Sequence, residues 1–349
     1  MKRQDYDLPY LLRYENVAWY EDGQVSILDR RIYPIKKEKV VCRSYSDVTK
    51  AIAEMVTQSA GPYTAVGMGM ALAAYECRKE SSENQINFLK EASYNLANAR
   101  PTTANRMSLI TEKSFEIGKE AILKGENPIE AIRLDTIDSL NRRYSTMENV
   151  AKYLVNLLSS DSAVLTQCYG ETIVGMLLRL AKQEKKDLKF YCAETRPYFQ
   201  GARLTASCCA EMGFDTTVIT DNMVAWLLEN EKVDIFTSAA DTITENGYVT
   251  NKIGTYQIAI LCEKFNVPYY VTGLPDIGKK DRDSIVIEMR DPEQMLKFLD
   301  IKITDKNVKG IYPSFDITPP ELIKGIITDK GIFKPEELSG YLKNPTKFY

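Results

Sequence analysis

The chain has 349 residues, enough for one large or two ordinary domains, and its 44% hydrophobic and 27% charged residues are typical of a globular protein. A net charge of −3 without a long basic run argues against a dedicated nucleic-acid binder, because such proteins depend on clustered lysine and arginine. No run of about 18 apolar residues is present and the first residues lack the apolar region of a signal peptide, so we expect a cytoplasmic protein without a membrane partner.

The first part of the chain predicts a short strand pair followed by helices. Residues 23–34 alternate in polarity, which favours two strands with a turn at Asp22-Gly23. Residues 44–61 predict a helix with Ser46 or Asp47 as its N-cap and Gly61 just past its end. Further helical patterns cover residues 65–80, 84–98, 107–123 and 127–158. We therefore expect a mainly helical N-terminal domain with a short antiparallel sheet over residues 1–146.

After about residue 160, short apolar runs alternate with helical patterns. This alternation predicts an α/β domain whose parallel sheet is covered on both faces, over residues 147–349. The expected strands are 162–168, 188–194, 215–220, 233–241 and 268–273, and the expected helices are 172–184, 200–213, 222–230 and 252–265.

The seven cysteines and the absence of histidine restrict the chemistry. The cysteine count is odd and contains no C-x-x-C pair, so we expect neither a zinc site nor a disulfide framework. Any acid–base catalysis must use Asp, Glu, Cys, Lys or Tyr side chains, because the chain contains no histidine. No Gly-x-Gly-x-x-Gly loop opens a helix after a strand, so we expect no nicotinamide cofactor and no metal.

Polar residues follow the predicted strands where each strand ends. Cys168 follows the first strand of the second domain, and Asp241 follows the fourth. Ligands of parallel sheets bind at the carboxyl ends of the strands, so we expect both residues to face a common crevice. A cysteine at a strand end is otherwise a small core residue, and an aspartate there is a turn or helix cap.

Several segments resemble the methylthioribose-1-phosphate isomerase family over nearly the whole chain. The three strongest are ETRPYFQGARLTA (194–206), TVITDNMVAWLL (217–228) and SAADTITENGYVTNKIGTYQIAIL (238–261). Three further segments agree with the family in order and spacing: ARPTTANRM (99–107), LTQC (165–168) and YPSFDITPPELIKGIITDKGI (312–332). Similar motifs occur in ribose-1,5-bisphosphate isomerases and in regulatory subunits of the eukaryotic translation-initiation exchange factor. The segment VAWYEDGQVSILDRR favours the first family.

The resemblance implies a helical N-terminal domain, a Rossmann-like C-terminal domain and commonly a homodimer. Enzymes of this family convert a 1-phosphorylated aldose to the 1-phosphorylated ketose in methionine salvage, so the implied ligand is a small sugar phosphate. By the same resemblance, Cys168 and Asp241 form the catalytic pair. A thiol and a carboxyl group can each be poised near neutral pH by an apolar pocket.

The resemblance also implies a set of substrate-binding positions. Arginine and lysine suit a phosphate group, whereas Arg196 and Arg203 are better explained as structural ion pairs. The implied binding residues are Arg100, Gln200, Asn251 and Lys252, with Gly61, Pro62 and Tyr63 at the substrate pocket.

Three departures from the family pattern fall at the site. The first glycine-rich loop reads GPYT at residues 61–64 and lacks the family's arginine, Gln167 stands where histidine is usual, and YGET follows Cys168 in place of an Asn- and Gly-rich turn. Two hypotheses therefore remain. One is an isomerase of methylthioribose 1-phosphate or a related 5-modified ribose 1-phosphate. The other is a non-catalytic or substrate-shifted protein that binds a phosphosugar or nucleotide, as the regulatory subunits do.

Overall fold

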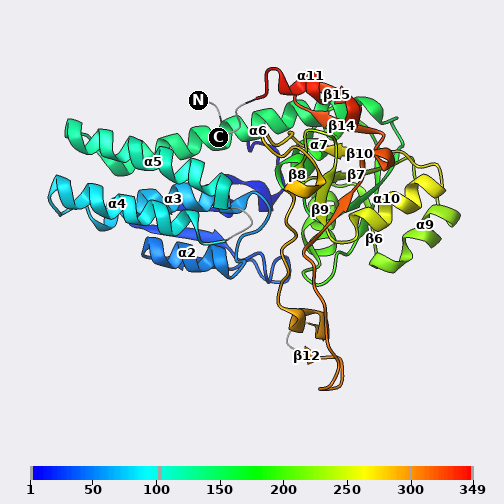
Figure 1. The fold of residues 1–349 in the computed structure, drawn as a ribbon, viewed down its shortest axis with the longest axis horizontal. Helices are drawn as coiled ribbons and strands as arrows, with labels where there is room; N and C mark the ends of the chain where they lie inside the picture. Colours follow the sequence, from blue (N-terminus) through cyan, green and yellow to red (C-terminus); the bar gives the residue numbers. More distant parts are fainter. Residues whose placement is uncertain (1–2, 101–103, 299–300, 347–349) are drawn as a thin grey trace. The chain divides into compact units, whose positions relative to one another are not determined.

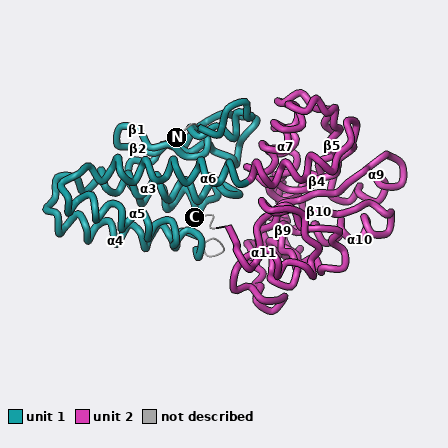
Figure 2. Tube along the Cα trace, turned by 90° about the horizontal axis from the view of Figure 1, so that it is seen from above, with its two compact units in different colours: residues 1–146, 347–349 teal, residues 147–346 magenta. Residues whose placement is uncertain are grey.

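A computed structural model describes residues 3–100, 104–298 and 301–346 of the chain. The chain divides into two compact units within the long helix α6 (Pro128–Leu157), where unit 1 ends at Thr146 and unit 2 begins at Met147 (Figure 2). Each unit has its own hydrophobic core, and each is described by itself.

Unit 1 opens with an antiparallel sheet in the order β1-β2-β3. The hairpin between β1 and β2 turns at Asp22 and Gly23, which both have positive φ, as the two-residue turns that match strand twist require. The turn predicted at these two residues is therefore confirmed. The strand pattern expected up to residue 34 is wrong beyond Leu28, because the chain there enters a run of turns. The strands are β1 (Trp19–Glu21), β2 (Gln24–Leu28) and β3 (Lys39–Cys42).

Helices make up most of the remainder of unit 1. Ser44, rather than Ser46 or Asp47, caps α2: its hydroxyl accepts from the Asp47 N–H, while the Asp47 carboxylate accepts from the Ser44 N–H. Gly61 does not end this helix but begins α3, which is buried along most of its length. The helices are η1 (Tyr10–Leu12), α1 (Tyr14–Val17), α2 (Tyr45–Ala53), α3 (Gly61–Glu76), α4 (Ser82–Ala97), α5 (Ala104–Lys124) and the first part of α6.

Unit 2 is built on a seven-stranded sheet in the order β15-β14-β10-β7-β4-β5-β6. All neighbouring strands are parallel except β14 and β15, so the predicted parallel sheet is confirmed. Its strands are β4 (Ala163–Gln167), β5 (Lys189–Ala193), β6 (Asp215–Ile219), β7 (Ile235–Ala239), β10 (Tyr269–Thr272), β14 (Gly325–Thr328) and β15 (Gly331–Phe333).

The strand order positions the site. With the six parallel strands numbered along the chain, their order is 3-2-1-4-5-6, which reverses direction between β4 and β7. Open α/β sheets bind ligands beyond the carboxyl ends of the strands at such a reversal. Cys168 follows β4 directly and Asp241 lies two residues beyond the end of β7, so both residues lie at this point.

The other elements of unit 2 cover or extend this sheet. A small antiparallel sheet, β8-β9-β13, carries Asn251 and Lys252 on its middle strand. Its strands are β8 (Thr242–Ile243), β9 (Val249–Lys252) and β13 (Phe315–Thr318). The helices include α7 (Thr172–Gln183), a π-helical turn (Gly201–Thr205) that leads into α8 (Ala206–Glu211), η4 (Asp221–Met223), α9 (Val224–Asn230), α10 (Thr255–Lys264), η5 (Arg282–Ser284), η7 (Pro320–Leu322), η8 (Pro335–Glu337) and α11 (Ser339–Leu342).

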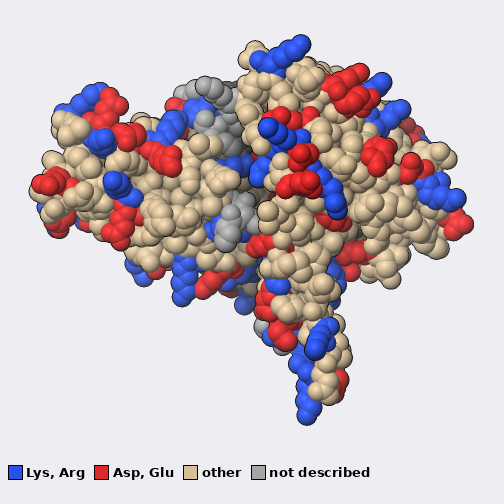
Figure 3. Space-filling model, viewed as in Figure 1, with Lys and Arg blue, Asp and Glu red and all other residues tan. Residues whose placement is uncertain are grey.

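A long hairpin, called the arm below and comprising the described residues 286–298 and 301–313, projects from the body of unit 2 (Figure 1). Its two sides are joined by main-chain hydrogen bonds, from Arg290 N–H to Tyr312 C=O at 2.9 Å and from Ile303 N–H to Leu296 C=O at 3.0 Å. Lysine and arginine side chains gather towards its far end (Figure 3), and Lys302 and Lys306 of the arm are exposed. It also holds η6 (Pro292–Leu296), β11 (Lys297–Phe298) and β12 (Ile301–Lys302).

Within the described residues, none of the helices combines the length and the apolar character needed to cross a lipid bilayer.

The close packing at Gly201 generates the first prediction. A Cβ atom on Gly201 would lie 1.8 Å from the main-chain oxygen of Ala193 at the end of β5, and backbone cannot move aside cheaply. We expect Gly201→Ala to destabilise the protein by about 3 kcal/mol, measured by denaturant unfolding. Ser207→Ala on the following helix is the control, expected within about 0.5 kcal/mol of wild type. Equal midpoints for wild type and Gly201→Ala would contradict the packing described.

Candidate active site

Cys168 and Asp241 lie on neighbouring strands at the reversal of the sheet. β4 and β7 pair directly, with Thr166 opposite Thr237. The main-chain N–H of Asp241 donates to Thr250 C=O at 2.8 Å, and this bond ties the residue to the small sheet. The carboxyl group is exposed, and its charge acts on the Cys168 thiol. The structure thus brings together the two residues that the sequence placed at a common crevice.

The backbone of Cys168 is held in an unusual conformation by its neighbours. Its φ of 63° lies in the left-handed region, which costs a residue other than glycine about 1 kcal/mol or more. Its N–H donates to Thr195 Oγ1 at 2.9 Å, and its C=O accepts from Thr205 Oγ1 at 2.5 Å. These contacts come from the segment after β5 and hold the thiol at the end of β4.

The thiol itself keeps its proton at neutral pH. Burial raises the pKa of Cys168 to about 11, the Lys252 and Arg290 charges act to lower this pKa, and Asp241 acts to raise it. We expected a thiol poised near neutral pH. Desolvation changes the pKa of this thiol more than the two cations do, because a thiolate loses more hydration on burial than a neutral thiol does.

Gln167, which stands where the resemblance leads one to expect histidine, joins the sheet to the segment after β9. It is almost completely buried at the last position of β4. Its Nε2 donates to Ile253 C=O at 2.9 Å, and its Oε1 lies 2.8 Å from Thr255 Oγ1. Thr255 Oγ1 also accepts from Asn251 Nδ2 at 3.1 Å. The amide therefore fixes β9 against the end of β4, a role that needs one donor and one acceptor but no titratable group.

Asn251 and Lys252 are buried side by side at the end of β9. They pair with Asp316 and Phe315 of β13, respectively. Lys252 Nζ lies 4.5 Å from the centre of the Phe315 ring, a distance at which the face of an aromatic ring attracts a cation. A buried lysine near the thiol can contact an anionic ligand.

Gln200 lies beyond β5, one residue before the π-helical turn. Its side chain is buried, and its Oε1 has no hydrogen-bond partner within the described part of the chain. A buried amide oxygen without a donor loses hydration and gains nothing in return. A ligand hydroxyl group would satisfy this atom, which agrees with the binding role that the resemblance implies.

Asp316 is a site carboxyl for which no role was predicted from the sequence. Its Oδ2 accepts from the Gly254 N–H at 2.7 Å, at the start of α10. Burial raises its pKa to about 6, although main-chain donors and Lys252 act in the opposite direction. The motif FDIT contains this residue, but only the pairing of β13 with β9 shows that it lies opposite Asn251.

The remaining predicted binding residues belong to unit 1. Gly61 and Pro62 are buried in the first turn of α3, which begins four residues before the helical pattern predicted over residues 65–80. The main-chain N–H groups at this helix start are partly used within the chain. The Gly61 and Tyr63 N–H groups donate to the Gln58 and Ala60 carbonyls, and Pro62 has no N–H.

Two buried arginines flank this helix start. Arg143 donates to Ala60 C=O at 3.2 Å and to Thr64 Oγ1 at 3.1 Å. A Cβ atom on Gly61 would lie 3.0 Å from Arg30 Nη1 and 2.0 Å from Thr57 Oγ1, so no side chain fits there. The arginine missing from residues 61–64 therefore does not leave this region without positive charge. Arg100 belongs to the same unit, and residues 101–103 of its motif lie outside the described residues.

Arg196 and Arg203, expected in ion pairs, donate to main-chain carbonyls. Arg196 Nη2 lies 2.9 Å from Lys297 C=O, and Arg203 Nε lies 3.0 Å from Tyr198 C=O. These bonds hold the arm and the segment after β5 in place.

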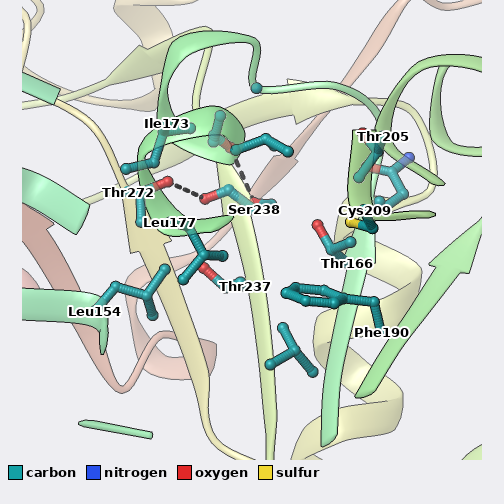
Figure 4. A pocket seen from close by; sticks show the side chains of 15 residues that line it. Leu154, Thr166, Ile173, Leu177, Phe190, Thr205, Cys209, Thr237, Ser238 and Thr272 are labelled. Carbon is teal, nitrogen blue, oxygen red and sulfur yellow. Dashed lines mark hydrogen bonds between the residues drawn. The ribbon is translucent and has the colours of Figure 1, made fainter. Parts of the chain in front are cut away.

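A small cavity lies beneath the site, between α7 and the sheet (Figure 4). Its volume of about 20 Å³ has room for one water molecule but not for a sugar. Thr237 Oγ1 faces it without a hydrogen-bond partner in the described residues, so a water molecule suits this place. No cluster of Cys, Asp or Glu side chains suited to a metal ion occurs in the portion of the chain that the structure describes.

Comparison with known proteins gives consistent relatives. The model of the Initiation factor 2 subunit family matches residues 59–335. Methylthioribose-1-phosphate isomerase 1 of Pseudothermotoga lettingae is 34% identical over 93% of this chain and 95% of its own length. The crystal structure of 5-methylthioribose 1-phosphate isomerase from Pyrococcus horikoshii OT3 superposes with a TM-score of 0.81 at 26% identity, covering 96% of this chain and 98% of that one. Translation initiation factor eIF-2B subunit delta from A. fulgidus gives a TM-score of 0.78 at 29% identity, covering 94% and 97%.

The raised pKa of Asp316 predicts a pH dependence of stability. A carboxyl whose folded-state pKa lies above its unfolded value contributes stability below the unfolded pKa near 4, and this contribution is lost as pH rises through about 6. We expect wild type to lose on the order of 2 kcal/mol relative to Asp316→Asn between pH 4 and pH 7, measured by denaturant unfolding.

Ile317→Val on the same strand is the control for this measurement, because it changes no titratable group. Its difference from wild type should stay constant over the same range. A constant difference for Asp316→Asn as well would show that this carboxyl titrates alike in the folded and unfolded states.

Proposed function

The chain belongs to the Initiation factor 2 subunit family and, within it, to the methylthioribose-1-phosphate isomerases, and from this membership we propose its reaction and substrate. It is an aldose–ketose isomerase that acts on methylthioribose 1-phosphate or a related 5-modified ribose 1-phosphate. The observation that carries this proposal is the meeting of Cys168 and Asp241 at the reversal of the sheet, beside the buried Lys252.

The chemistry requires two proton-transfer groups. A phosphate on O1 prevents simple ring opening to a free aldehyde, so the ring oxygen must receive a proton as the C1–O bond to the ring breaks. One hydrogen then moves from C2 to C1 while O2 loses its proton and becomes the ketone oxygen. Cys168 and Asp241 supply and accept these protons, and the Cys168 thiol enters the reaction in its protonated form.

The ligand-binding roles follow from the family resemblance of each residue's motif. Arg100 and Lys252 hold the phosphate, and Gln200 and Asn251 bind sugar hydroxyls. Tyr63 lies in the first turn of α3, whose start differs from the family loop, so we place the selection of the substrate's 5-substituent there. We further propose a cytoplasmic homodimer with a role in methionine salvage.

A second candidate is a protein that binds a phosphosugar or nucleotide without converting it. The similarity to eIF-2B subunit delta, whose TM-score is close to that of the isomerase, favours this alternative, as does the missing loop arginine. The retained Cys168 and Asp241 favour the isomerase. Turnover of a panel of 5-substituted ribose 1-phosphates, followed by NMR, separates the two candidates, because a binding protein would bind members of the panel and convert none.

The catalytic pair generates one prediction. We expect Cys168→Ser and Asp241→Asn each to lower kcat about 10²–10⁴-fold on the best substrate, with an unchanged circular-dichroism spectrum. Cys77→Ser in unit 1 is the matched control, since its Sγ lies 3.7 Å from a carbonyl that a serine hydroxyl could also use. A variant of either Cys168 or Asp241 with wild-type kcat would remove that residue from the mechanism.

Phosphate binding generates another prediction. Arg100→Ala should weaken binding of a phosphosugar about 10-fold or more, measured by calorimetry, because a charged hydrogen bond contributes about 1.4 kcal/mol or more. The exposed Arg282 provides the control substitution Arg282→Ala. Wild-type affinity in Arg100→Ala would show that the phosphate is held elsewhere. Restoring an arginine at Gly61 is not a useful test, because its side chain would collide with Thr57 and Arg30.

A further inference from the structure

Arg290 carries a buried charge at the base of the arm. Its side chain is only 8% exposed, and its Nη2 lies 3.2 Å from Glu288 Oε2. The other terminal nitrogen, Nη1, is also buried and makes no hydrogen bond of acceptable geometry to any described residue. A buried guanidinium N–H without an acceptor destabilises a protein, so this end of the side chain calls for an explanation.

The surroundings of Arg290 are aromatic. The Tyr198 and Phe315 ring centres lie 5.8 Å and 5.9 Å from its Cζ, and Phe315 is the same ring that Lys252 contacts. The hydroxyl of Tyr312 lies next to the guanidinium, close enough for Arg290 to act on its pKa, although neither this hydroxyl nor Nη1 makes a hydrogen bond of good geometry to a described residue. Burial raises the pKa of Tyr312 to about 12, so this hydroxyl remains a hydrogen-bond donor. Arg290 and Tyr312 therefore offer donors in a place where rings exclude water.

This corner lies within electrostatic range of the proposed catalytic thiol. The charge of Arg290 acts on Cys168 in the same direction as that of Lys252, and Cys168 and Tyr312 also interact electrostatically. Asp241 is the carboxylate that acts on the thiol in the opposite direction.

We propose that Arg290, through its Nη1, binds an oxygen of the substrate's phosphate group on the Cys168 side of the site. The inference rests on the proposed function and adds to it a phosphate ligand supplied by the arm. A guanidinium presents several N–H groups in a fixed plane, so Nη2 can hold Glu288 while Nη1 faces the phosphate. The ammonium group of Lys252 lies over the same Phe315 ring and supplies a second positive charge for the phosphate.

The alternative is a purely structural Arg290 that holds the arm through Glu288. The two roles differ in what each substitution removes. Arg290→Met removes both the contact with Glu288 and the proposed contact with phosphate. Arg290→Lys keeps the positive charge but lacks the two terminal nitrogens of a guanidinium. Glu288→Gln weakens only the contact within the arm.

The first experiment measures binding of inorganic phosphate to the full chain by calorimetry. We expect about 10-fold or more weaker binding in Arg290→Met, an intermediate loss in Arg290→Lys, and affinity within about twofold of wild type in Glu288→Gln. Wild-type phosphate affinity in Arg290→Met overturns the proposal. An equal loss in Glu288→Gln and Arg290→Met also overturns it, because the arm contact would then be the cause.

The second experiment uses Cys168 as a reporter. All seven cysteines lie in the described residues and Cys168 alone is not buried, so iodoacetamide should modify it selectively, with Cys168→Ser as the blank. Phosphate should slow this modification in wild type and not in Arg290→Met at the same concentration. Without phosphate, Arg290→Met should react several-fold more slowly at pH 8–9, because one of the two cations that favour the thiolate is gone. Equal protection of both proteins by phosphate would contradict the proposal.

Neither measurement requires turnover. If the chain binds phosphate through Arg290 but converts no 5-substituted ribose 1-phosphate, the proposed function fails and the anion site stands. If turnover is found and Arg290→Met binds phosphate as wild type does, the proposed function stands and the assignment of Arg290 is wrong.

Discussion

The side-chain amide of Gln167 connects the seven-stranded sheet to the three-stranded sheet of unit 2, and the arrangement of the candidate site depends on this connection. Its Nε2 donates to Ile253 C=O, and its Oε1 lies within hydrogen-bond distance of Thr255 Oγ1, which in turn accepts from Asn251. Cys168 comes directly after Gln167, so the same bonds fix the distance from the thiol to β9. A buried amide is satisfied only when donor and acceptor are both matched, and this requirement selects one arrangement of the two sheets.

Much of this arrangement can be predicted from the sequence. The apolar runs at 162–168, 188–194, 215–220, 233–241 and 268–273 all contain strands of the main sheet, because strands of a parallel sheet are bounded by polar segments and separated by helices. The rule that ligands bind at carboxyl strand ends was sufficient to bring Cys168 and Asp241 together. It did not require the strand order, which the sequence does not reveal.

Other features depend on contacts that are distant in sequence. Ser44 rather than Ser46 caps α2, because the choice among nearby polar residues depends on the residue at which the preceding strand, β3, ends. Gly61 starts a helix rather than following one, and the buried Arg30 and Thr57 that crowd its Cα come from a segment distant from α3 or preceding it. Arg290 reaches the site only because the two sides of the arm pair with each other, and local pattern gives no signal of such pairing. Residue type predicts the chemistry of a site better than it predicts which distant segment completes it.

The protonated state of Cys168 has a consequence for its chemical durability. Peroxides and disulfides react with the thiolate, so a cysteine whose pKa lies near 11 presents very little reactive form at neutral pH. Cys168 is also the one cysteine among the seven that is not fully buried as a residue. The desolvation that keeps its sulfur protonated therefore limits its oxidation. A cation-rich site that converted it to a thiolate would make it a base at neutral pH but would expose it to irreversible sulfinic acid formation.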